Sequence, residues 1–530
     1  MDSESIYQQR WKILGILCLS VFLAVVDNTI VNVALPTMSR SLNANNSQLQ
    51  WIVDSYSLVF SSLLLVGGSI GDRFGRKRML QIGLMLFAGF SAAAAMSSNV
   101  GTLIAMRGLM GVGSALIFPA TLAILTNVFR DPVERAKAIG AWSGVVGLAV
   151  ALGPISGGVL LKHFWWGSIF LVNLPIALTA IVLGAKYIPD SRDSETPPLD
   201  FAGFALSIAG VFALVFTTIQ APEHGWASAQ TLGGYAIGIA MLVALVNVEL
   251  RKAHPMLDVS VFKNLRFTSA SLSITLCFFA FFGFIFLITQ YFQFVRGYDT
   301  LSAGVHTLPF AAVAATVSPF SPRLAMRFGT RRVVTTGLSI MAVGFFLASR
   351  IEATSNYWDI VIISMMLLAL GLSLTTAPST TVILSVLPPD KAGVGSAIND
   401  TTRELGGTLG VAVIGSVFSS VYGPKFVAAV KGLPIPVPAL SAAKSSVGAA
   451  FEVARRAGEP GAQLITAAAK SSFVSGFQVG CIVSGSVVLV AALLAAALLP
   501  NKASDRSILD QDILEFTDNQ TAVLSAAAGA

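Results

Sequence analysis

Long runs of apolar residues, separated by short polar loops, dominate this chain. A helix needs about 20 such residues to cross the hydrocarbon core of a bilayer. An even number of spans places both termini on the same side of the membrane. The pattern predicts fourteen membrane-spanning helices, at 13–35, 51–70, 79–97, 102–128, 138–161, 167–187, 200–219, 231–249, 268–291, 301–321, 333–350, 358–386, 395–421 and 473–499.

The composition supports an all-α integral membrane protein. Of the 530 residues, 54% are hydrophobic and 12% are charged, whereas about 25% are charged in soluble proteins. The net charge of +7 does not indicate nucleic acid binding, because the basic residues are spread over short loops instead of one face. All three cysteines lie in apolar runs, which argues against a disulfide framework.

The distribution of Lys and Arg predicts the orientation. With the N-terminus inside, the cytoplasmic segments hold 22 of the 34 basic residues, and the short outer loops hold four. Six more lie in the long outer segment 422–472, where charge has little influence on topology. The last two, Arg107 and Arg403, lie inside spans. We therefore expect a multi-pass protein with both termini in the cytoplasm.

A short loop after the second span concentrates charge between two glycines, and runs Gly68-Ser-Ile-Gly-Asp-Arg-Phe-Gly-Arg-Lys-Arg78. A degenerate copy, Pro322-Arg-Leu-Ala-Met-Arg-Phe-Gly-Thr-Arg-Arg332, follows the tenth span, 254 residues later. The two copies predict a duplicated architecture. Repeated halves with a site at their interface are the general plan of secondary transporters.

The copies divide the chain into segments. We expect an N-terminal six-helix half at 1–190, and an inserted helix pair with a cytoplasmic amphipathic linker at 191–267. A C-terminal six-helix half follows at 268–500, including the outer loop 422–472, to which the sequence assigns no role. The polar, then Ala-rich, segment 501–530 is predicted to be a disordered cytoplasmic tail.

Charged residues inside the spans are the candidate functional groups, because an intramembrane charge is costly. Asp27 and Arg107 lie in mid-span. A purely structural carboxylate, bonded to a neighbouring helix, is the alternative for Asp27. Asp54 follows Trp51 near the outer end of the second span, where solvation is the alternative.

The thirteenth span opens with Asp400, Arg403 and Glu404, which share a helix face. Glu404 is the member expected to face a cavity, and an ion-paired rim at the inner headgroup level is the alternative. The fifth span contains Gly153-Pro154-Ile155-Ser156-Gly157-Gly158. Small residues allow close helix contact and the proline permits a bend, so this stretch predicts a conformational hinge.

These motifs resemble those of the major facilitator superfamily. The first basic loop is similar to the signature loop of that family at Gly68, Asp72, Arg73, Gly75, Arg76 and Lys77. The run around Arg107 resembles the fourth-helix motif. The Gly-Pro-x-x-Gly-Gly run resembles the hallmark of proton-driven exporters. From about Trp11 to Pro500, the chain resembles the fourteen-span drug:proton antiporter branch.

The resemblance implies a multidrug efflux permease in the cytoplasmic membrane. It would confer antibiotic resistance by exporting amphiphilic, often cationic, compounds in exchange for protons. Asp27, Arg107 and Glu404 are the expected proton-coupling residues. The matched loop residues, with Gly153, Pro154, Gly157 and Gly158, are expected to gate. The candidate substrate-binding residues are Asp54, Trp51, Tyr56, Asn28, Asn173 and Phe118.

Other functions remain open at this point. A dedicated proton-coupled exporter of one endogenous metabolite, lipid or amino acid would have almost the same sequence. A channel would not need the duplicated loops. An enzyme is not expected, because the sequence lacks a catalytic constellation, a nucleotide-binding loop and a metal cluster. We therefore expect no cofactor and no metal, a proton gradient as the driving force, and a monomer among membrane lipids.

Overall fold

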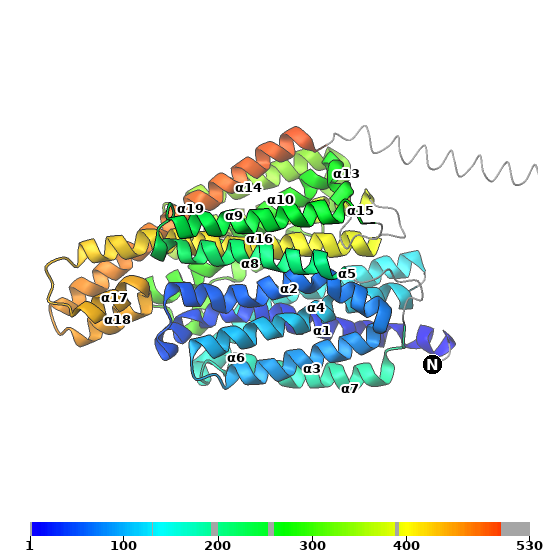
Figure 1. Ribbon diagram of the computed structural model, residues 1–530, viewed down its shortest axis with the longest axis horizontal. Coiled ribbons are helices and arrows are strands. Elements are labelled where there is room, and N and C mark those ends of the chain that lie inside the picture. The colour runs from blue at the N-terminus through cyan, green and yellow to red at the C-terminus, as the bar shows by residue number, and fades with distance from the viewer. Residues whose placement is uncertain (1–2, 130, 192–199, 253–258, 387–391, 500–530) are drawn as a thin grey trace, which may run out of the picture.

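The chain folds into a bundle of long helices (Figure 1). The computed structural model describes residues 3–129, 131–191, 200–252, 259–386 and 392–499, and these contain helices and no strand. The all-α prediction is confirmed. The predicted tail, 501–530, lies outside the described residues.

The chain begins with nine α-helices. They are α1 (Ser3–Leu42), α2 (Asn46–Phe74), α3 (Arg76–Ala95), α4 (Val100–Val128), α5 (Pro132–His163), α6 (Ser168–Leu171), α7 (Asn173–Tyr187), α8 (Phe201–His224) and α9 (Ala229–Glu249). The later elements are η1 (Val259–Lys263), α10 (Leu265–Gln290), η2 (Tyr291–Val295), α11 (Thr300–Val305), α12 (Leu308–Val317), α13 (Ser321–Phe328), α14 (Thr330–Ala348), η3 (Tyr357–Val361), α15 (Ile362–Ser385), α16 (Ala392–Ala429), α17 (Val437–Ser445), α18 (Val447–Arg456) and α19 (Gly461–Leu498).

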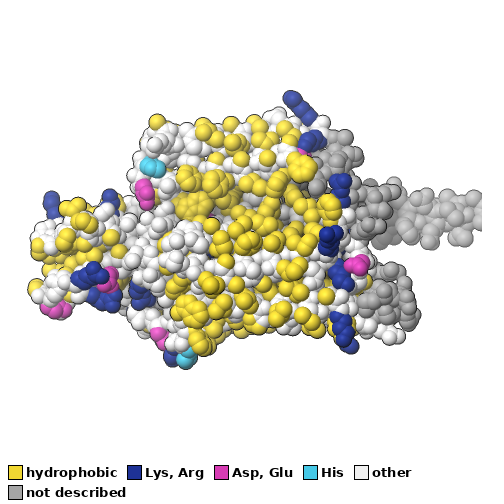
Figure 2. Space-filling model, turned by 60° about the horizontal axis from the view of Figure 1, so that its bottom comes forward, with side chains coloured by type: hydrophobic (Ala, Val, Ile, Leu, Met, Phe, Trp, Pro, Cys, Tyr) yellow, Lys and Arg dark blue, Asp and Glu magenta, His cyan; other side chains and the backbone are white. Residues whose placement is uncertain are grey.

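The number of long apolar helices agrees with the predicted spans. Among the described residues, thirteen helical segments are long and apolar enough to cross a membrane. Between the first two of them lies α2, whose 29 residues also exceed the length needed to cross about 30 Å of hydrocarbon. Hydrophobic side chains cover the middle of the bundle, and charged ones lie toward its ends (Figure 2).

Local sequence explains where several helices begin. Asn45 caps α2: its side chain accepts a hydrogen bond from the Gln48 amide at 2.7 Å, and the Gln48 side chain accepts one from the Asn45 amide at 3.0 Å. This reciprocal pair satisfies two amides that the helix leaves unpaired. The predicted span 301–321 is interrupted after α11, and Pro309 starts α12 because its missing N–H is tolerated in a first turn.

The helices form two groups and a pair. In the first group, α2 and α3 pack on α4, while α1 packs on α5 and α7. In the second, α10 packs on α16 and α14 packs on α15 and α19. Helices α8 and α9 pack on each other, and α8 contacts both groups through α2 and α16. An ion pair between Lys252 and Asp200 joins the end of α9 to the start of α8.

The two copies of the basic loop have the same backbone. Gly75 separates α2 from α3 with a φ of 105°, and Gly329 separates α13 from α14 with a φ of 91°. Each glycine amide donates to the carbonyl four residues earlier, that of Gly71 or Ala325. Residues with a side chain rarely adopt such a φ, so both turns need glycine. The repeated sequence therefore corresponds to a repeated turn.

At the end of the bundle opposite these loops, hydrogen bonds between uncharged groups join the first group of helices to the second. Thr289 donates to the Asn32 carbonyl at 3.1 Å, and Gln293 donates to the Val33 carbonyl at 2.8 Å. We call these contacts, with the two described next, the outer seam.

The outer seam continues on the flanks of α1. Gln50 at the start of α2 donates to the Ala412 carbonyl of α16 at 3.2 Å. Thr300 of α11 donates to the Gly158 carbonyl of α5 at 3.3 Å. All four hydrogen bonds therefore join one half of the bundle to the other.

The segment 422–472 is largely helical, so it is more ordered than a predicted loop would be. Helix α16 continues to Ala429, α17 and α18 follow, and α19 begins at Gly461. This module extends beyond the ends of the other helices (Figure 1). Ser446 donates to the Ala44 carbonyl at 3.0 Å, and Phe451 stacks on Phe294 with 5.8 Å between ring centroids. The module therefore contacts both halves.

The linker before α10 is described only in part. Residues 253–258 lie outside the described residues, and Val259–Lys263 forms one short 3-10 turn without buried side chains. The amphipathic helix expected in this linker therefore stays a prediction.

Glycines on α5 allow this helix to pack closely against α1 and α11. A Cβ atom at Gly153 would overlap the hydroxyl of Thr29 on α1, and one at Gly158 would lie 2.6 Å from the Leu301 Cα. The same helix carries Gly144, where an added Cβ atom would meet no other atom within 4 Å. The predicted hinge residues are therefore points of close packing, while their movement stays a prediction.

We expect Gly153→Ala to destabilise the protein and Gly144→Ala, which meets open space and replaces a poor helix former, to leave its stability equal or slightly higher. The added methyl group at position 153 must push α5 away from α1, and such overpacking costs about 1–3 kcal/mol. The unfolding midpoints of the purified proteins in detergent measure the difference, with size-exclusion chromatography used to monitor the loss of folded protein on heating. Equal midpoints for both variants would contradict this packing.

Candidate functional site

Asp27 of α1 and Arg107 of α4 form an ion pair in the middle of the first half. Both side chains have no exposed surface. A buried pair of this kind is held only when further hydrogen bonds satisfy its remaining polar atoms. The structure therefore brings together the two residues that were predicted as the main coupling groups.

Helices around the pair supply several of those hydrogen bonds, while one terminal nitrogen of Arg107 has no partner among the described residues. Asn173, at the start of α7, donates to the second Asp27 oxygen at 2.8 Å, and its amide group also lies 3.0 Å from the Ser91 hydroxyl. Arg107 Nε donates to the Ile52 carbonyl at 3.0 Å. Five helices, namely α1, α2, α3, α4 and α7, are thus linked through one carboxylate and one guanidinium.

Tyr56 connects this pair to a cavity. The Arg107 guanidinium lies over the Tyr56 ring, 4.5 Å from its centroid. The Tyr56 hydroxyl lies 2.7 Å from that of Ser114 and also donates to the Ala24 carbonyl at 3.3 Å. Tyr56 itself lines the cavity, so one ring contacts both the ion pair and the open space.

The cavity lies between the two halves. Helices α1, α2, α4 and α5 form one wall, and α10 and α16 form the other. Its volume is about 60 Å³, well below the roughly 300–1,000 Å³ of small-molecule pockets. A larger molecule therefore enters only when the halves part. The lining residues are Ala24, Val25, Asn28, Thr29, Tyr56, Phe60, Phe118, Val146, Val150, Phe278, Phe281, Phe282, Asp400, Arg403 and Glu404.

Three charged side chains, all from α16, enter this cavity. The Arg403 guanidinium lies 3.6 Å from an Asp400 oxygen and 4.7 Å from the centroid of the Phe278 ring. Glu404 lines the cavity beside them. The cluster therefore faces the space between the halves, as expected for Glu404, while its depth relative to the inner headgroup level stays a prediction.

Aromatic rings from both halves surround these charges. Phe60 lies 5.1 Å from Phe118 in the first half, and Phe281 lies 5.3 Å from Phe282 in the second. Aromatic faces beside carboxylates can bind an organic cation by cation–π and ionic attraction. The cavity can thus accept either a proton on a carboxylate or a small cationic molecule.

The structure separates the predicted substrate-binding residues into three groups. Asn28, Tyr56 and Phe118 line the cavity. Asn173 instead holds Asp27. Trp51 lies away from the cavity, where its ring faces Phe212 and Phe216 of α8 at about 6 Å. The binding roles themselves stay predictions.

Asp54 does not line the cavity either. Gln50, one turn earlier, bonds the Ala412 carbonyl, and Leu58, one turn later, packs with Ala412 and Val215. Asp54 therefore lies on the α2 face that meets α16 and α8. Its side chain is buried, which excludes the solvated alternative, and neither carboxylate oxygen has a hydrogen-bond partner among the described residues.

The predicted gating loop is described incompletely. Arg76 donates to the Ala123 carbonyl at 3.4 Å, and its amide donates to the Ser191 carbonyl at 2.9 Å. Arg73 is exposed, Lys77 is half-buried, and Gly68 approaches Pro119. The side chain of Asp72 lies outside the described residues. The gating role expected for Asp72, Arg76 and the other matched loop residues therefore stays a prediction.

Sequence reasoning did not select the aromatic wall of α10. Phe278, Phe281 and Phe282 recur at the three- and four-residue spacing of a helix face, which is the signal that marks them. The same span also contains Phe279, Phe284 and Phe286, which are buried elsewhere in the helix packing. Spacing alone cannot distinguish the cavity face from these other faces.

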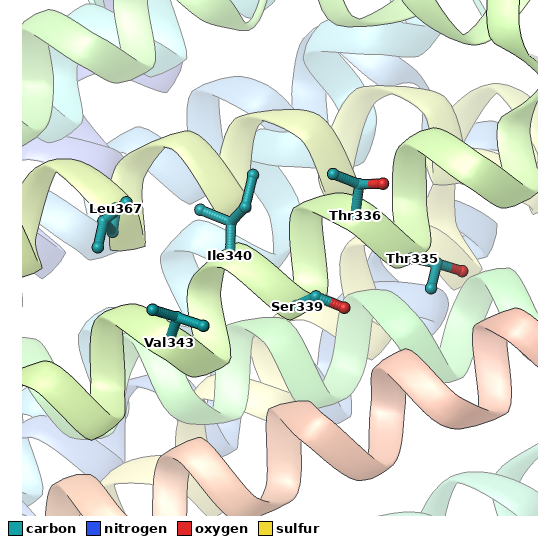
Figure 3. Close-up of a pocket in the computed structure, with 6 residues that line it drawn as sticks. All are labelled: Thr335, Thr336, Ser339, Ile340, Val343 and Leu367. Atoms are coloured by element: carbon teal, nitrogen blue, oxygen red, sulfur yellow. The ribbon is translucent and has the colours of Figure 1, made fainter.

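A second hollow, of about 290 Å³, lies on the outside of the bundle (Figure 3). Its residues come from α14 and α15, and they are Thr335, Thr336, Ser339, Ile340, Val343 and Leu367. They include no charged side chain, and Val343 is 58% exposed. The groove therefore offers an apolar surface without groups that exchange protons or attract cations.

We expect Asp27→Asn and Arg107→Gln each to lower the yield of folded protein, and the double variant to recover it. Removing one partner leaves a buried charge unpaired, which costs about 3–5 kcal/mol, while the double variant leaves two neutral groups that can bond each other. Size-exclusion profiles and unfolding midpoints in detergent measure this. A double variant no more stable than either single one would show that the pair is not the main determinant.

Comparison with known proteins agrees with this architecture. The sequence profile described as Major Facilitator Superfamily matches residues 17–411 and 305–497. The multidrug efflux pump LfrA of Mycolicibacterium smegmatis is 36% identical over 490 residues, covering 91% of this chain and 95% of LfrA. The methyl viologen resistance protein SmvA of Salmonella typhimurium is 33% identical over 490 residues, covering 92% and 97%.

A solved structure shares the fold. It is that of a bacterial homologue of the human lysosomal transporter Spinster, in an inward-facing and unoccupied conformation. The TM-score is 0.63, with 17% sequence identity, and the match covers 93% of this chain and 99% of the other. With the sequence profile spanning most of the chain, the protein belongs to the Major Facilitator Superfamily.

Proposed function

We propose that this protein exports amphiphilic, cationic molecules across the cytoplasmic membrane in exchange for protons. The observation that carries the proposal is the cavity between the halves, which combines two carboxylates with aromatic rings from both sides. The names of the relatives, a multidrug efflux pump and a methyl viologen resistance protein, support a drug-like substrate.

The charges of the cavity account for exchange. Two carboxylates, Asp400 and Glu404, face one guanidinium, that of Arg403. One carboxylate is thus left without a cationic partner, and a buried carboxylate of this kind is costly in its charged form. A proton or a cationic substrate can supply the missing positive charge. Because the two occupants compete for the same carboxylate, binding of one favours release of the other.

The buried pair couples this exchange to movement. Protonation of Asp27 removes its charge, so the Arg107 guanidinium loses its ionic partner and the helices linked through it can rearrange. The Tyr56 ring, which contacts both Arg107 and the cavity, places the rearrangement next to the substrate. Rocking of the two halves around such a central site gives alternating access.

The remaining features of the proposal follow from the same arrangement. The protein acts as a monomer in the lipid bilayer, with both termini in the cytoplasm, and without cofactor or metal. It is a transporter and performs no covalent chemistry, so a proton gradient supplies the driving force.

Proton coupling can be measured in inverted membrane vesicles with an acidic interior, reported by a quenched pH-sensitive dye. We expect ethidium to cause dequenching with the wild type and not with Asp27→Asn, when the vesicles contain equal amounts of folded protein. Glu404→Gln should raise the KM for ethidium about tenfold, because a charged cavity partner is lost. The exposed Glu223 of α8 provides the matched control, and Glu223→Gln should behave as the wild type.

Other outcomes would change the assignment. Dequenching with Asp27→Asn would transfer the coupling step to Glu404 or Asp54. No response of folded wild-type protein to any of a panel of cationic and neutral drugs would contradict multidrug export. A dedicated exporter of one endogenous compound would then be the better description.

The orientation can be tested with single cysteines in a Cys18→Ser background, in which the two other cysteines are buried. We expect Ser441→Cys, at an exposed position of α17, to react with a membrane-impermeant maleimide in intact cells. Asn127→Cys, at an exposed position near the end of α4, should react only after permeabilisation. The reverse pattern would place the termini outside.

A further inference from the structure

Arg403 differs from the other intramembrane arginine in how firmly it is held. Arg107 is fully buried, with an ion pair and a hydrogen bond at 3.0 Å to the Ile52 carbonyl. The side chain of Arg403 is 33% exposed, and its 3.6 Å contact with Asp400 is longer than a hydrogen bond. One guanidinium nitrogen of each arginine has no hydrogen-bond partner among the described residues, so the difference lies in the exposure of Arg403 and in its longer ionic contact. Arg403 is therefore weakly fixed within the cavity.

The position of Arg403 coincides with the site that suits a cationic substrate. Its guanidinium is a planar cation that lies over the Phe278 ring at 4.7 Å. Asp400 is next to it, and Glu404 and Phe282 line the same cavity. A flat organic cation would need the same aromatic face and the same carboxylates. The arginine side chain already occupies the Phe278 face and pairs with Asp400, one of the two carboxylates.

We propose that Arg403 is a tethered competitor, which fills the cation site of the substrate-free transporter and which a cationic substrate must displace. The proposal rests on the function proposed above and adds a specificity-determining residue to it. Substrates that stack strongly on Phe278 displace the guanidinium, whereas small, well-hydrated ammonium ions do not. Arg403 thus selects for flat aromatic cations.

The tethered cation also has a role when no substrate is bound. Without it, Asp400 and Glu404 would share a low-dielectric cavity with no positive charge, which is unfavourable for two neighbouring carboxylates. Arg403 balances one of these charges. A substrate that displaces it restores the balance, so binding exchanges one cation for another at the same aromatic face.

The test measures the direct binding of ethidium to the purified protein by fluorescence anisotropy. Arg403→Gln should bind ethidium about threefold to tenfold more tightly than the wild type, because the competing cation–π contact is gone. Arg403→Lys should bind more tightly by a smaller factor, since its hydrated ammonium competes less well for an aromatic face. Affinity for a neutral aromatic compound of similar size should change less.

Arg455→Gln is the matched control. Arg455 pairs with Glu452 at the same three-residue helical spacing as Arg403 with Asp400, but it lies on α18 and is 74% exposed. Its substitution should leave ethidium binding unchanged.

The outcomes separate this inference from the proposed function. Unchanged or weaker binding by a monodisperse Arg403→Gln protein, beside a wild type that binds ethidium, would overturn the tethered competitor. If Arg403→Gln does not fold, Arg403→Lys takes its place. Ethidium binding by Arg403→Lys that is equal to or weaker than that of the wild type would then overturn the tethered competitor. A wild type that binds no cation would instead contradict the proposed function itself.

Discussion

The buried pair of Asp27 and Arg107 is the interaction on which the first half depends. A carboxylate and a guanidinium without any exposed surface are stable in an apolar bundle only while each neutralises the other. Because Asn173 and the Ile52 carbonyl add further hydrogen bonds to the pair, it fixes the relative positions of five helices. The cavity wall that contains Tyr56 is built on this fixed group.

The second half supplies a different kind of site. Its charged cluster on α16 is loosely held and faces open space, whereas the pair in the first half is closely bonded and closed. Tyr56 lies between the two sites: the Arg107 guanidinium lies over its ring, and Tyr56 lines the cavity that the cluster enters. Under the proposed function, the closely bonded pair responds to protons and the loosely held cluster accepts the cation, an arrangement that suits the exchange of unlike substrates.

Much of this could be predicted from the sequence, because the strongest signals are local. Apolar runs located the spans, and the repeated basic loops predicted a duplicated architecture, which agrees with the positive φ that the structure has at both Gly75 and Gly329. Asp27, Arg107 and Glu404 stood out because charge is rare inside spans. The pairing of Asn173 with Asp27 and the distance of Trp51 from the cavity depend on how helices rotate about their axes. Apolar spans packed on all sides carry little periodicity, so the sequence did not determine those rotations.

The neutral character of the outer seam bears on how the membrane potential acts on the protein. Each hydrogen bond described there joins an uncharged side chain, such as Gln293 or Thr289, to a backbone carbonyl. Parting these contacts moves no ionised group through the electric field, which acts on charge at about 2.3 kcal/mol per elementary charge per 100 mV. Under the proposed function, the voltage dependence of the transport cycle is then set inside the bundle, by the difference between the charge that leaves with the substrate and the charge that returns with the protons.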